Sequence, residues 1–322
     1  MVLFYSCTGK SGTGQGSAAV HKPQSRGLAY EVALIVPRAV YNGELKDTLD
    51  AVLRCSTPVL PQHEPLFRVD VVYPDGNLTP WRTLRNRLIV ETDRSVKTPR
   101  MGVARDVVAV PQVEVKVEAA SAHELAVFLG RNKERLQEVF VEAELEYEAA
   151  NLRRKHSQRT LEELKALTGH TICVPTGLKA SKQGMDFLWT GTNLNDKDQN
   201  FVFYSYLWDG QPFSPERYVA ARDSALQANI PGSRPDQWMQ TAREAGQPLI
   251  LTRTRTLYNM SVYEVHGLWE MHDGALGGAF VALERVDSAA RRVLVTEGFI
   301  YSPHSPKRDL LRQMEAALRT FR

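Results

Sequence analysis

The sequence contains little cysteine and no long hydrophobic run. Only Cys7, Cys55 and Cys173 occur among its 322 residues, and their spacing matches none of the cysteine and histidine patterns that hold a metal ion. No stretch approaches the ~18 consecutive apolar residues that indicate a membrane-spanning helix. The sequence therefore excludes a disulfide-dense scaffold, and it predicts neither a metal site nor a transmembrane helix.

Concentrated charge of one sign is also absent. The formal net charge is +3, and arginines such as Arg82, Arg85 and Arg87 are scattered rather than gathered in one block. Nucleic-acid binding usually requires a concentrated basic surface. We therefore expect no nucleic-acid partner. The hydrophobic content of 43% and charged content of 24% are those of an ordinary globular chain of one large or two modest domains.

No cofactor or catalytic motif is complete. The segment Gly9–Ser11 resembles the end of a phosphate-binding loop, but Phe4 stands where the motif requires its first glycine. His123 and Glu124 resemble the start of a zinc-protease motif, but Val127 replaces the second histidine. We expect no bound cofactor, and the sequence leaves the catalytic residues, if any, unknown.

Cys7 is the most informative residue present. It follows the apolar residues 2–5 and Ser6, and the polar, Gly- and Ser-rich residues 8–28 follow it. This is the pattern of a bacterial lipoprotein at its processing site, so we expect Cys7 to be lipidated. Residues 1–28 then form a truncated signal with its lipobox and a flexible tether. The competing interpretation is a frayed N-terminus with a chance cysteine.

The segment before Cys7 is shorter than a signal peptide. A signal needs a basic region followed by roughly 7–15 apolar residues, whereas six residues precede Cys7 and none of them is basic. We therefore expect the true start codon to lie upstream of Met1.

Lipidation would determine where the protein resides. Membrane contact would come through the N-terminal lipid anchor, because several acyl chains anchor stably where a single chain does not. The expected location is the cell envelope, facing the periplasm or the cell surface. Cys55 and Cys173 could form a disulfide in that compartment, but their apolar surroundings favour two buried free thiols.

Residues 29–156 are predicted to form an N-terminal α+β half. Alternating and apolar runs predict strands, and helical spacing predicts a helix at 44–54 and a long helix at 121–155. Ser121 and Glu124 form a capping box at the start of the long helix. The strands are expected at 30–36, 67–73, 87–91 and 106–118.

Residues 157–322 are predicted to form a C-terminal α+β half. A capping box at Thr160 and Glu163, a Ser214-Pro215 start and a Ser305-Pro306 start each predict a helix. Strands are expected at 170–174, 187–190, 201–208, 249–258, 261–271, 279–286 and 292–301. Consecutive strands with short turns imply antiparallel pairing. The fold class is therefore α+β: antiparallel sheets with helices packed on them, in two similar halves.

A polar row on the predicted strand 261–271 suggests one candidate site. Alternation places Glu270 and His272 on one face and Trp269 on the other. Glu270 and His272 would be ~7 Å apart, and a metal ion could bridge them if a neighbouring strand supplied further ligands. The competing interpretation, which alternation itself favours, packs Trp269 into the core and leaves the polar row in solvent.

Arg253 and Arg255 share one face of the predicted strand 249–258. Two arginines on one face could bind an anionic ligand. The commoner outcome is cross-strand pairing with a carboxylate such as Glu264 or Glu284. Five side chains are thus candidate ligand-binding residues: Arg253, Arg255, Trp269, Glu270 and His272.

Several strings resemble an uncharacterised family of Bacteroidetes lipoproteins known only as domain of unknown function 4837. They are Gly267–Met271, Gly277–Val281, Glu297–Pro303, Lys307–Ala316, Asp186–Trp189, Gln227–Gly232 and Pro58–Phe67. The resemblance covers about residues 28–322 and implies an exported, lipid-anchored protein. It carries over no catalytic residue. The C-terminal half is also similar, more weakly, to the α+β sandwich of PsbP-like and Mog1-like proteins, which are accessory and binding modules.

These observations favour a lipid-anchored cell-envelope protein of unknown biochemical function that acts as a non-enzymatic binding or accessory module. Its partner would be an envelope protein or another envelope component. One alternative is an envelope-acting enzyme with a polar site around Glu270 and His272. A further alternative is a scaffold that binds no ligand. The sequence specifies neither the ligand, nor the oligomeric state, nor the membrane leaflet.

Overall fold

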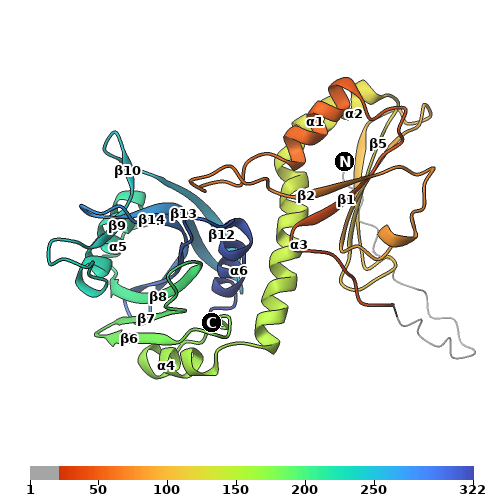
Figure 1. Cartoon of the computed structure of the whole chain (residues 1–322). Coiled ribbons are helices and arrows are strands. Elements are labelled where there is room, and N and C mark those ends of the chain that lie inside the picture. Colours follow the sequence, from red (N-terminus) through yellow and green to blue (C-terminus); the bar gives the residue numbers. More distant parts are fainter. Residues whose placement is uncertain (1–21) are drawn as a thin grey trace, which may run out of the picture. The chain divides into compact units, whose positions relative to one another are not determined.

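The computed structural model describes residues 22–322, so Cys7 and most of the predicted tether lie outside the described residues. The chain divides into two compact units (Figure 1). Unit 1 contains the residues up to Ser56 together with Pro65–Glu144, and unit 2 contains Thr57–Glu64 together with Leu145–Arg322. No helix of the described residues is both long enough and apolar enough to span a membrane.

Unit 1 is built on a five-stranded sheet with the strand order β2-β1-β3-β5-β4. Strands β1, β2, β3 and β5 run parallel, and β4 is an antiparallel edge strand. The strands are β1 (Glu31–Ile35), β2 (Arg68–Val72), β3 (Asn86–Thr92), β4 (Arg100–Arg105) and β5 (Val113–Ala119).

The parallel strands of unit 1 correct the prediction of two similar antiparallel halves. The helix α1 (Gly43–Leu53) connects β1 to β2, and such a crossover is what lets consecutive strands run parallel. Four of the five residues of β1 are buried, as is usual for a parallel strand covered on both faces. The α+β class itself is confirmed.

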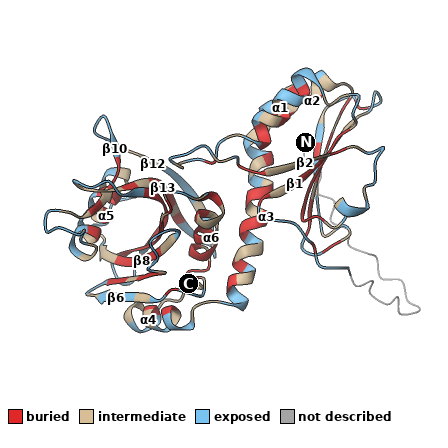
Figure 2. Ribbon diagram, in the orientation of Figure 1, coloured by how far each residue is buried: buried red, intermediate tan, exposed pale blue. Residues whose placement is uncertain are grey.

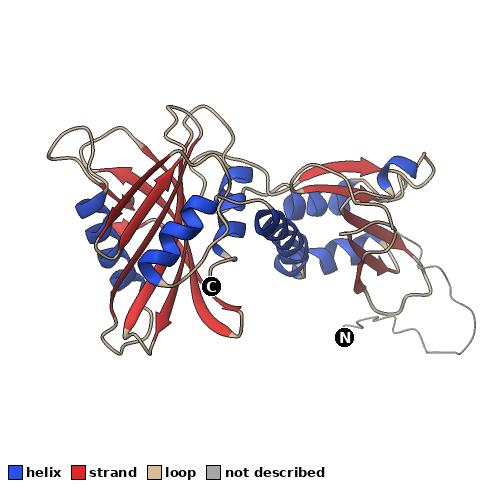
Figure 3. Cartoon of the chain, turned by 90° about the horizontal axis from the view of Figure 1, so that it is seen from below, coloured by secondary structure: helices blue, strands red, loops and turns tan. Residues whose placement is uncertain are grey.

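Three helices cover one face of the sheet of unit 1 (Figures 1 and 3). They are α1, α2 (Ala122–Arg131) and α3 (Lys133–Arg154), and α3 continues into unit 2. The predicted single helix 121–155 is thus two helices that meet at Asn132, whose side-chain amide donates to the Phe128 carbonyl at 2.8 Å. The predicted cap is present, because the Ser121 hydroxyl accepts from the Glu124 N–H at 3.2 Å.

The opposite face of this sheet carries a short helix of its own. The 3₁₀ helix η1 (Thr79–Trp81) lies in the connection between β2 and β3. Its Trp81 and the preceding Leu78 pack against Ala33 and Ile35 of β1. Along β1, Ala33 and Ile35 alternate with Val32 and Leu34, so the two pairs of side chains lie on opposite faces of the sheet. Helix η1 therefore covers the face that the three helices leave open.

Unit 2 contains an eight-stranded antiparallel sheet, as predicted for the C-terminal half. Its order is β12-β13-β14-β15-β8-β7-β6, and β9 also pairs with β13. The strands are β6 (Ala180–Gly184), β7 (Phe187–Gly191), β8 (Asp198–Leu207), β9 (Met239–Thr241), β12 (Ile250–Leu257), β13 (Met260–Met271), β14 (Gly277–Asp287) and β15 (Arg292–Tyr301). A separate two-stranded hairpin joins β10 (Arg243–Glu244) to β11 (Gln247–Pro248).

Both faces of the large sheet are covered (Figure 2). Helix α5 (Pro215–Asn229) buries Tyr218, Val219 and Leu226 in the main core cluster of this unit. Helix α6 (Arg308–Leu318) packs on the other face, where a Cβ added to Gly298 would lie 2.8 Å from the Cβ of Met314. Helix α4 (Gln158–Thr168) precedes the sheet.

Some local predictions differ from the structure. Residues 170–174 form no strand, although Thr171 exchanges backbone hydrogen bonds with Arg322. Ser157, not Thr160, caps α4, and Lys307, not Ser305, precedes α6. Each is a boundary shift of two or three residues, which local propensity does not resolve.

The last residues of the predicted tether pair with unit 1. The Ser25 N–H donates to the Val110 carbonyl and the Arg26 N–H to the Thr83 carbonyl, both at 3.0 Å. Backbone pairing of this kind does not depend on apolar side chains, which is why the polar composition did not reveal it.

Candidate functional site

A cleft of about 440 Å³ opens beside the start of β1 in unit 1. Its walls come from the segment that leads into β1 and from the segment around η1. The lining residues are Arg26, Gly27, Leu28, Glu31, Pro80, Trp81 and Leu84. Clefts of roughly 300–1,000 Å³ that combine apolar walls with a few polar groups are the usual form of small-ligand sites.

The apolar wall of the cleft is held by local structure. The Thr79 N–H donates to the Asn77 side chain at 3.0 Å, which closes the turn before η1. Pro80 then occupies the first turn, where its missing N–H costs no hydrogen bond. Trp81 and Leu84 both pack against the sheet, so the wall is fixed to β1 rather than free to swing.

Gly27 allows the two walls to approach. Its φ of +122° is a conformation that other residues rarely adopt, and a Cβ there would lie 2.8 Å from Leu84 Cδ1 and 3.0 Å from a carboxylate oxygen of Glu31. Only glycine fits both the backbone angle and the space.

Glu31 is the titratable group of the cleft. Its Oε2 accepts from the Leu28 N–H at 2.5 Å. Burial raises the pKa of the Glu31 carboxyl most, the Leu28 bond lowers it, and the hydrogen bond and negative charge of Asp70 raise it further. The net effect is a raised pKa. Asp70 lies opposite Ala33 in the parallel β1–β2 pair, which places it beside Glu31.

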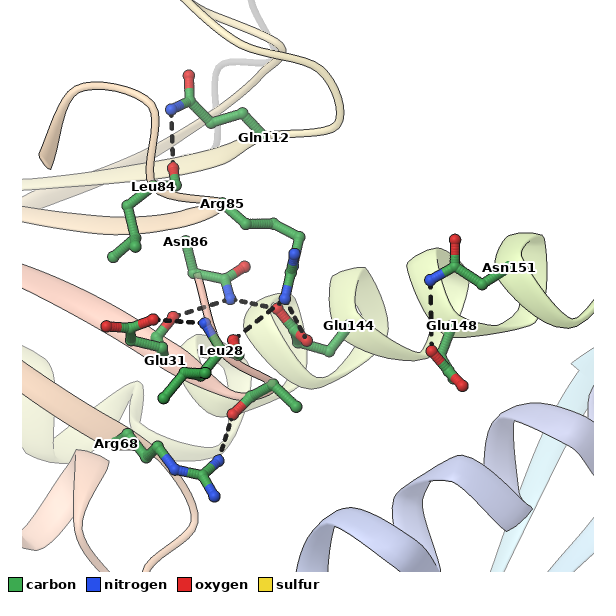
Figure 4. Close-up of polar contacts among 11 residues, drawn as sticks. Leu28, Glu31, Arg68, Leu84, Arg85, Asn86, Gln112, Glu144, Glu148 and Asn151 are labelled. Atoms are coloured by element: carbon green, nitrogen blue, oxygen red, sulfur yellow. Dashed lines mark hydrogen bonds and ion pairs between the residues drawn. The ribbon is translucent and has the colours of Figure 1, made fainter. Parts of the chain in front are cut away.

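A buried polar cluster behind the cleft holds Glu31 in position (Figure 4). Arg85 Nε donates to Glu144 at 2.7 Å, and both side chains are almost completely buried. Asn86 donates to Glu144 at 2.6 Å and to the Glu31 carbonyl at 3.1 Å, while Arg85 also donates to the Leu28 carbonyl at 3.1 Å. Both ends of the 28–31 segment are therefore bound to one cluster.

Asp70 acts on Glu31 from beside the cleft. Its negative charge helps to raise the pKa of the Glu31 carboxyl, but Asp70 is not one of the lining residues. Glu31 is therefore the acidic side chain that the cleft presents to a ligand.

Unit 2 contains a charged pair that is inaccessible to solvent. Arg222 and Glu297 are completely buried and form a bidentate ion pair, with N–O distances of 2.8 and 2.7 Å. Arg222 also donates to the Thr241 hydroxyl at 3.0 Å and lies over the Phe280 ring. These contacts link α5, β15 and β9 and serve packing rather than ligand binding.

A second cluster in unit 2 contains metal-type ligands. Single ligand atoms of Glu264, His266 and Glu315 lie within 4.8 Å of one another. Arg319, however, lies 3.4 Å from Glu264 and 3.1 Å from Glu315, and Arg312 lies 2.6 Å from Glu315. These guanidinium groups neutralise the carboxylates, so the cluster is an ion-pair network and a poor site for a cation.

The pKa of Glu264 reflects the same neutralisation. Burial acts to raise it, but the hydrogen bond and charge of His266, together with Arg319 and Arg255, lower it to about 2. Arg255 Nε lies 3.5 Å from Glu264, so cross-strand pairing is present for this arginine. Arg253 is exposed on the same edge strand.

The other three candidate residues from the sequence, Trp269, Glu270 and His272, each make different contacts. Trp269 is buried in the core and donates to the Ile300 carbonyl at 3.2 Å. Glu270 accepts from Gln240 at 3.1 Å. His272 stacks on Trp238, with ring centres 4.0 Å apart. No cavity described for unit 2 is lined by these three residues, and their assignment as ligand-binding residues stays a prediction. Cys55 and Cys173 are free, partly buried thiols.

Sequence reasoning did not find the cleft. Its residues belong to two segments about fifty positions apart, Arg26–Glu31 and Pro80–Leu84. The sequence pattern places the first of these partly in the predicted tether. One signal was present: Glu31 is an acidic residue at the start of an otherwise apolar, buried strand, where a charge is unusual unless it has a partner or a role.

The chain is a two-unit α+β protein with an open cleft in unit 1. The chain belongs to the family described as Domain of unknown function (DUF4837), whose model matches residues 157–320. Residues 25–153, which include the cleft, match a second model described as Domain of unknown function (DUF8532). No curated protein sequence matches the chain.

Solved structures with a similar arrangement cover about half of the chain. The Ran-binding protein Mog1p of Saccharomyces cerevisiae is 10% identical with a TM-score of 0.32, over 48% of this chain and 92% of that chain. The human StarD13 (DLC2) lipid transfer and protein localization domain is 11% identical with a TM-score of 0.21, over 44% of this chain and 86% of that chain. Likeness at this level carries no functional conclusion.

Proposed function

We propose that this protein is a lipid-anchored binding protein of the cell envelope and that the cleft of unit 1 is its ligand site. The observation that carries the proposal is the cleft itself: a cavity of about 440 Å³ lined by Glu31, Arg26 and Trp81. Acceptor, donor and aromatic surface meet there, which is the composition of a small-molecule site.

The distribution of charge supports binding at this place. In unit 2 arginines of the same unit pair with the buried carboxylates Glu297, Glu264 and Glu315, and the buried Glu284 accepts from the Tyr206 hydroxyl. In unit 1 Arg85 is matched by Glu144. Arg26 and Glu31, by contrast, line open space.

Hydrogen–deuterium exchange tests the site. The Cys7→Ser chain would be compared with and without soluble fragments released from the native envelope by enzymatic digestion. We expect slower exchange confined to the backbone of residues 26–31 and 79–84, because a bound ligand restricts both walls of the cleft. Protection confined to other segments, or no protection at any fragment concentration, would contradict the proposal.

The envelope location is supported by the sequence around Cys7 and by the resemblance to Bacteroidetes lipoproteins. A lipid on Cys7 would keep both units at the membrane surface, facing the periplasm or the cell surface, without a membrane-spanning helix. Expression in the native host from the genomic locus, followed by detergent phase partitioning, tests this. Wild-type protein should enter the detergent phase and the Cys7→Ser variant the aqueous phase. Equal partitioning would reject the anchor.

We propose an envelope protein as a second partner, held near the anchor by the tethered module. Cross-linking in intact cells followed by purification tests this. The wild-type chain should capture the same protein repeatedly, whereas the Cys7→Ser variant, displaced from the membrane, should capture less of it. Equal capture by both variants would show that anchoring plays no part in the partnership.

A further inference from the structure

We propose that the cleft of unit 1 takes the ring of a neutral saccharide. This inference rests on the proposed function, because it names the ligand class of the same site. Three features of the cleft carry it: an aromatic and apolar wall, the carboxyl acceptor Glu31, and the guanidinium donor Arg26, whose charge is opposite.

The apolar wall suits the carbon-bearing face of a sugar ring. Trp81, Pro80 and Leu84 form it, and Trp81 is held by its packing on Ala33 and Ile35. Indole rings offer a large, rigid apolar surface at little entropic cost, and they recognise flat ligands that are apolar on one side and polar at the edge. A sugar ring has this character, since its C–H bonds gather on its faces and its hydroxyls at its rim.

The polar wall suits hydroxyl groups. Glu31 lines the cleft, and its Oε2 accepts one bond, from the Leu28 N–H, so the carboxyl keeps further oxygen lone pairs as acceptors. Sugar hydroxyls donate to such oxygens. Exposed Arg26, which also lines the cleft, supplies donors for the ring and hydroxyl oxygens.

The charge balance favours a neutral ligand over an ion. Glu31 and Arg26, which both line the cleft, carry opposite charges. Arg85, the other nearby cation, is already neutralised by Glu144 at 2.7 Å. A cationic ligand would be repelled by Arg26 and an anionic one by Glu31, whereas a polyol is repelled by neither.

The size of the cleft agrees with this class. At about 440 Å³ it lies near the lower end of small-ligand sites, which suits about one or two sugar rings rather than a lipid chain or a folded peptide. A side chain at Gly27 would collide with Leu84 and Glu31, so the close approach of the two walls is part of the fold.

Fluorine NMR of 5-fluorotryptophan-labelled protein tests the proposal. The chain contains five tryptophans, Trp81, Trp189, Trp208, Trp238 and Trp269, and the Trp81→Phe variant identifies the Trp81 resonance. We expect the disaccharide of N-acetylglucosamine to shift that resonance in a saturable manner and to leave the other four in place. Glu31→Gln and the exposed-site variant Arg26→Gln should each weaken binding about ten-fold, the effect of losing one charged hydrogen-bonding group.

The control variant is Glu91→Gln. Glu91 lies on β3 and pairs with Lys116 outside the cleft, so its affinity for the disaccharide should equal that of the wild type. The Trp81 resonance of the ligand-free protein reports whether unit 1 of each variant is folded, and the four other tryptophan resonances report on unit 2. If Glu31→Gln loses its native spectrum, Arg26→Gln alone carries the test, and unchanged affinity in that variant counts against the proposal.

Two further probes separate the ligand class from the site. Choline represents a cation and benzoate an anion. A Trp81 shift with choline or benzoate but not with the disaccharide would overturn the saccharide inference and leave the cleft as a ligand site. No Trp81 shift with any of the three probes, or shifts confined to other tryptophans, would overturn both the inference and the proposed site.

Discussion

Buried carboxyl groups in this protein ionise according to their partners, not according to burial alone. Glu284 and Glu264 are both nearly inaccessible to solvent. Glu264 faces His266 and arginines, and its pKa falls to about 2. Burial raises the pKa of Glu284 to about 7, because only the Tyr206 hydroxyl, at 3.0 Å, and the charge of Arg217 oppose it. The two residues therefore make stability depend on pH in opposite directions.

Replacing Glu284 by Gln should stabilise the protein increasingly as pH rises. The folded-state pKa of about 7 exceeds the unfolded value of 4.5, so the folded state binds the extra proton and wild-type stability falls between these pH values. The loss is up to about 3 kcal/mol. Glutamine does not ionise and still accepts from Tyr206. Urea unfolding at pH 5 and pH 8 measures this, and an equal difference between the two proteins at both pH values would contradict it.

Replacing Glu264 by Gln should have the opposite pH profile. Its folded-state pKa of about 2 lies below 4.5, so its contribution is present above pH 4.5 and is lost as pH falls toward 2. Removing one member of a buried ion-pair network costs about 3–5 kcal/mol. The free energy of unfolding should therefore drop at pH 7 and much less at pH 3. A loss of equal size at both would mean that the cluster is not ionised.

At the scale of single elements, local sequence patterns predicted several helices and strands, but they did not predict how the strands pair. Val113, Val115 and Val117 alternate and lie in β5, which is buried at every second position. The Ser121 cap and the Ser214–Pro215 start both mark real helices. The edge strands β4 and β6 escaped notice because most of their residues are exposed, and those of β6 are also mostly polar. Parallel or antiparallel pairing is decided by partners that no local pattern contains.

Two serines that the sequence suggests as helix starts, Ser121 and Ser305, should differ in their effect on stability. Ser121→Ala should cost about 1 kcal/mol, because its hydroxyl accepts a helix N–H at 3.2 Å. Ser305→Ala should stay within about 0.5 kcal/mol, because the residue before α6 is Lys307. Thermal or urea unfolding of both variants measures the difference, and equal costs would show that the assigned helix start is wrong.

The fully buried Arg222–Glu297 pair joins three elements of unit 2. Arg222→Met should cost about 3–5 kcal/mol, because Glu297 is left buried without its cation. Replacing both residues, as Arg222→Met with Glu297→Met, should recover part of that loss because no buried charge remains. Urea unfolding gives both values. This account of the pair would be contradicted if the double variant lost more free energy of unfolding than the two single variants lose in sum.

At the scale of the whole molecule, the α+β class and the antiparallel sheet of unit 2 could be predicted from sequence, but the cleft could not. Strand alternation and turns are local, so they survive in a single sequence. The cleft joins Arg26 and Glu31 to Trp81, and only folding of η1 over β1 brings these together. The candidates chosen from the sequence, such as Glu270 and His272, form a polar row on one strand. In the structure Glu270 accepts from Gln240 and His272 stacks on Trp238.

The account as a whole depends on the cleft of unit 1 being a ligand site. A crystal structure of the Cys7→Ser chain grown with the disaccharide of N-acetylglucosamine tests this most directly. The account predicts a sugar ring packed on Trp81, with hydroxyls within hydrogen-bond distance of Glu31 or Arg26. A cleft closed by the chain's own side chains, or sugar bound only at another place, would contradict it.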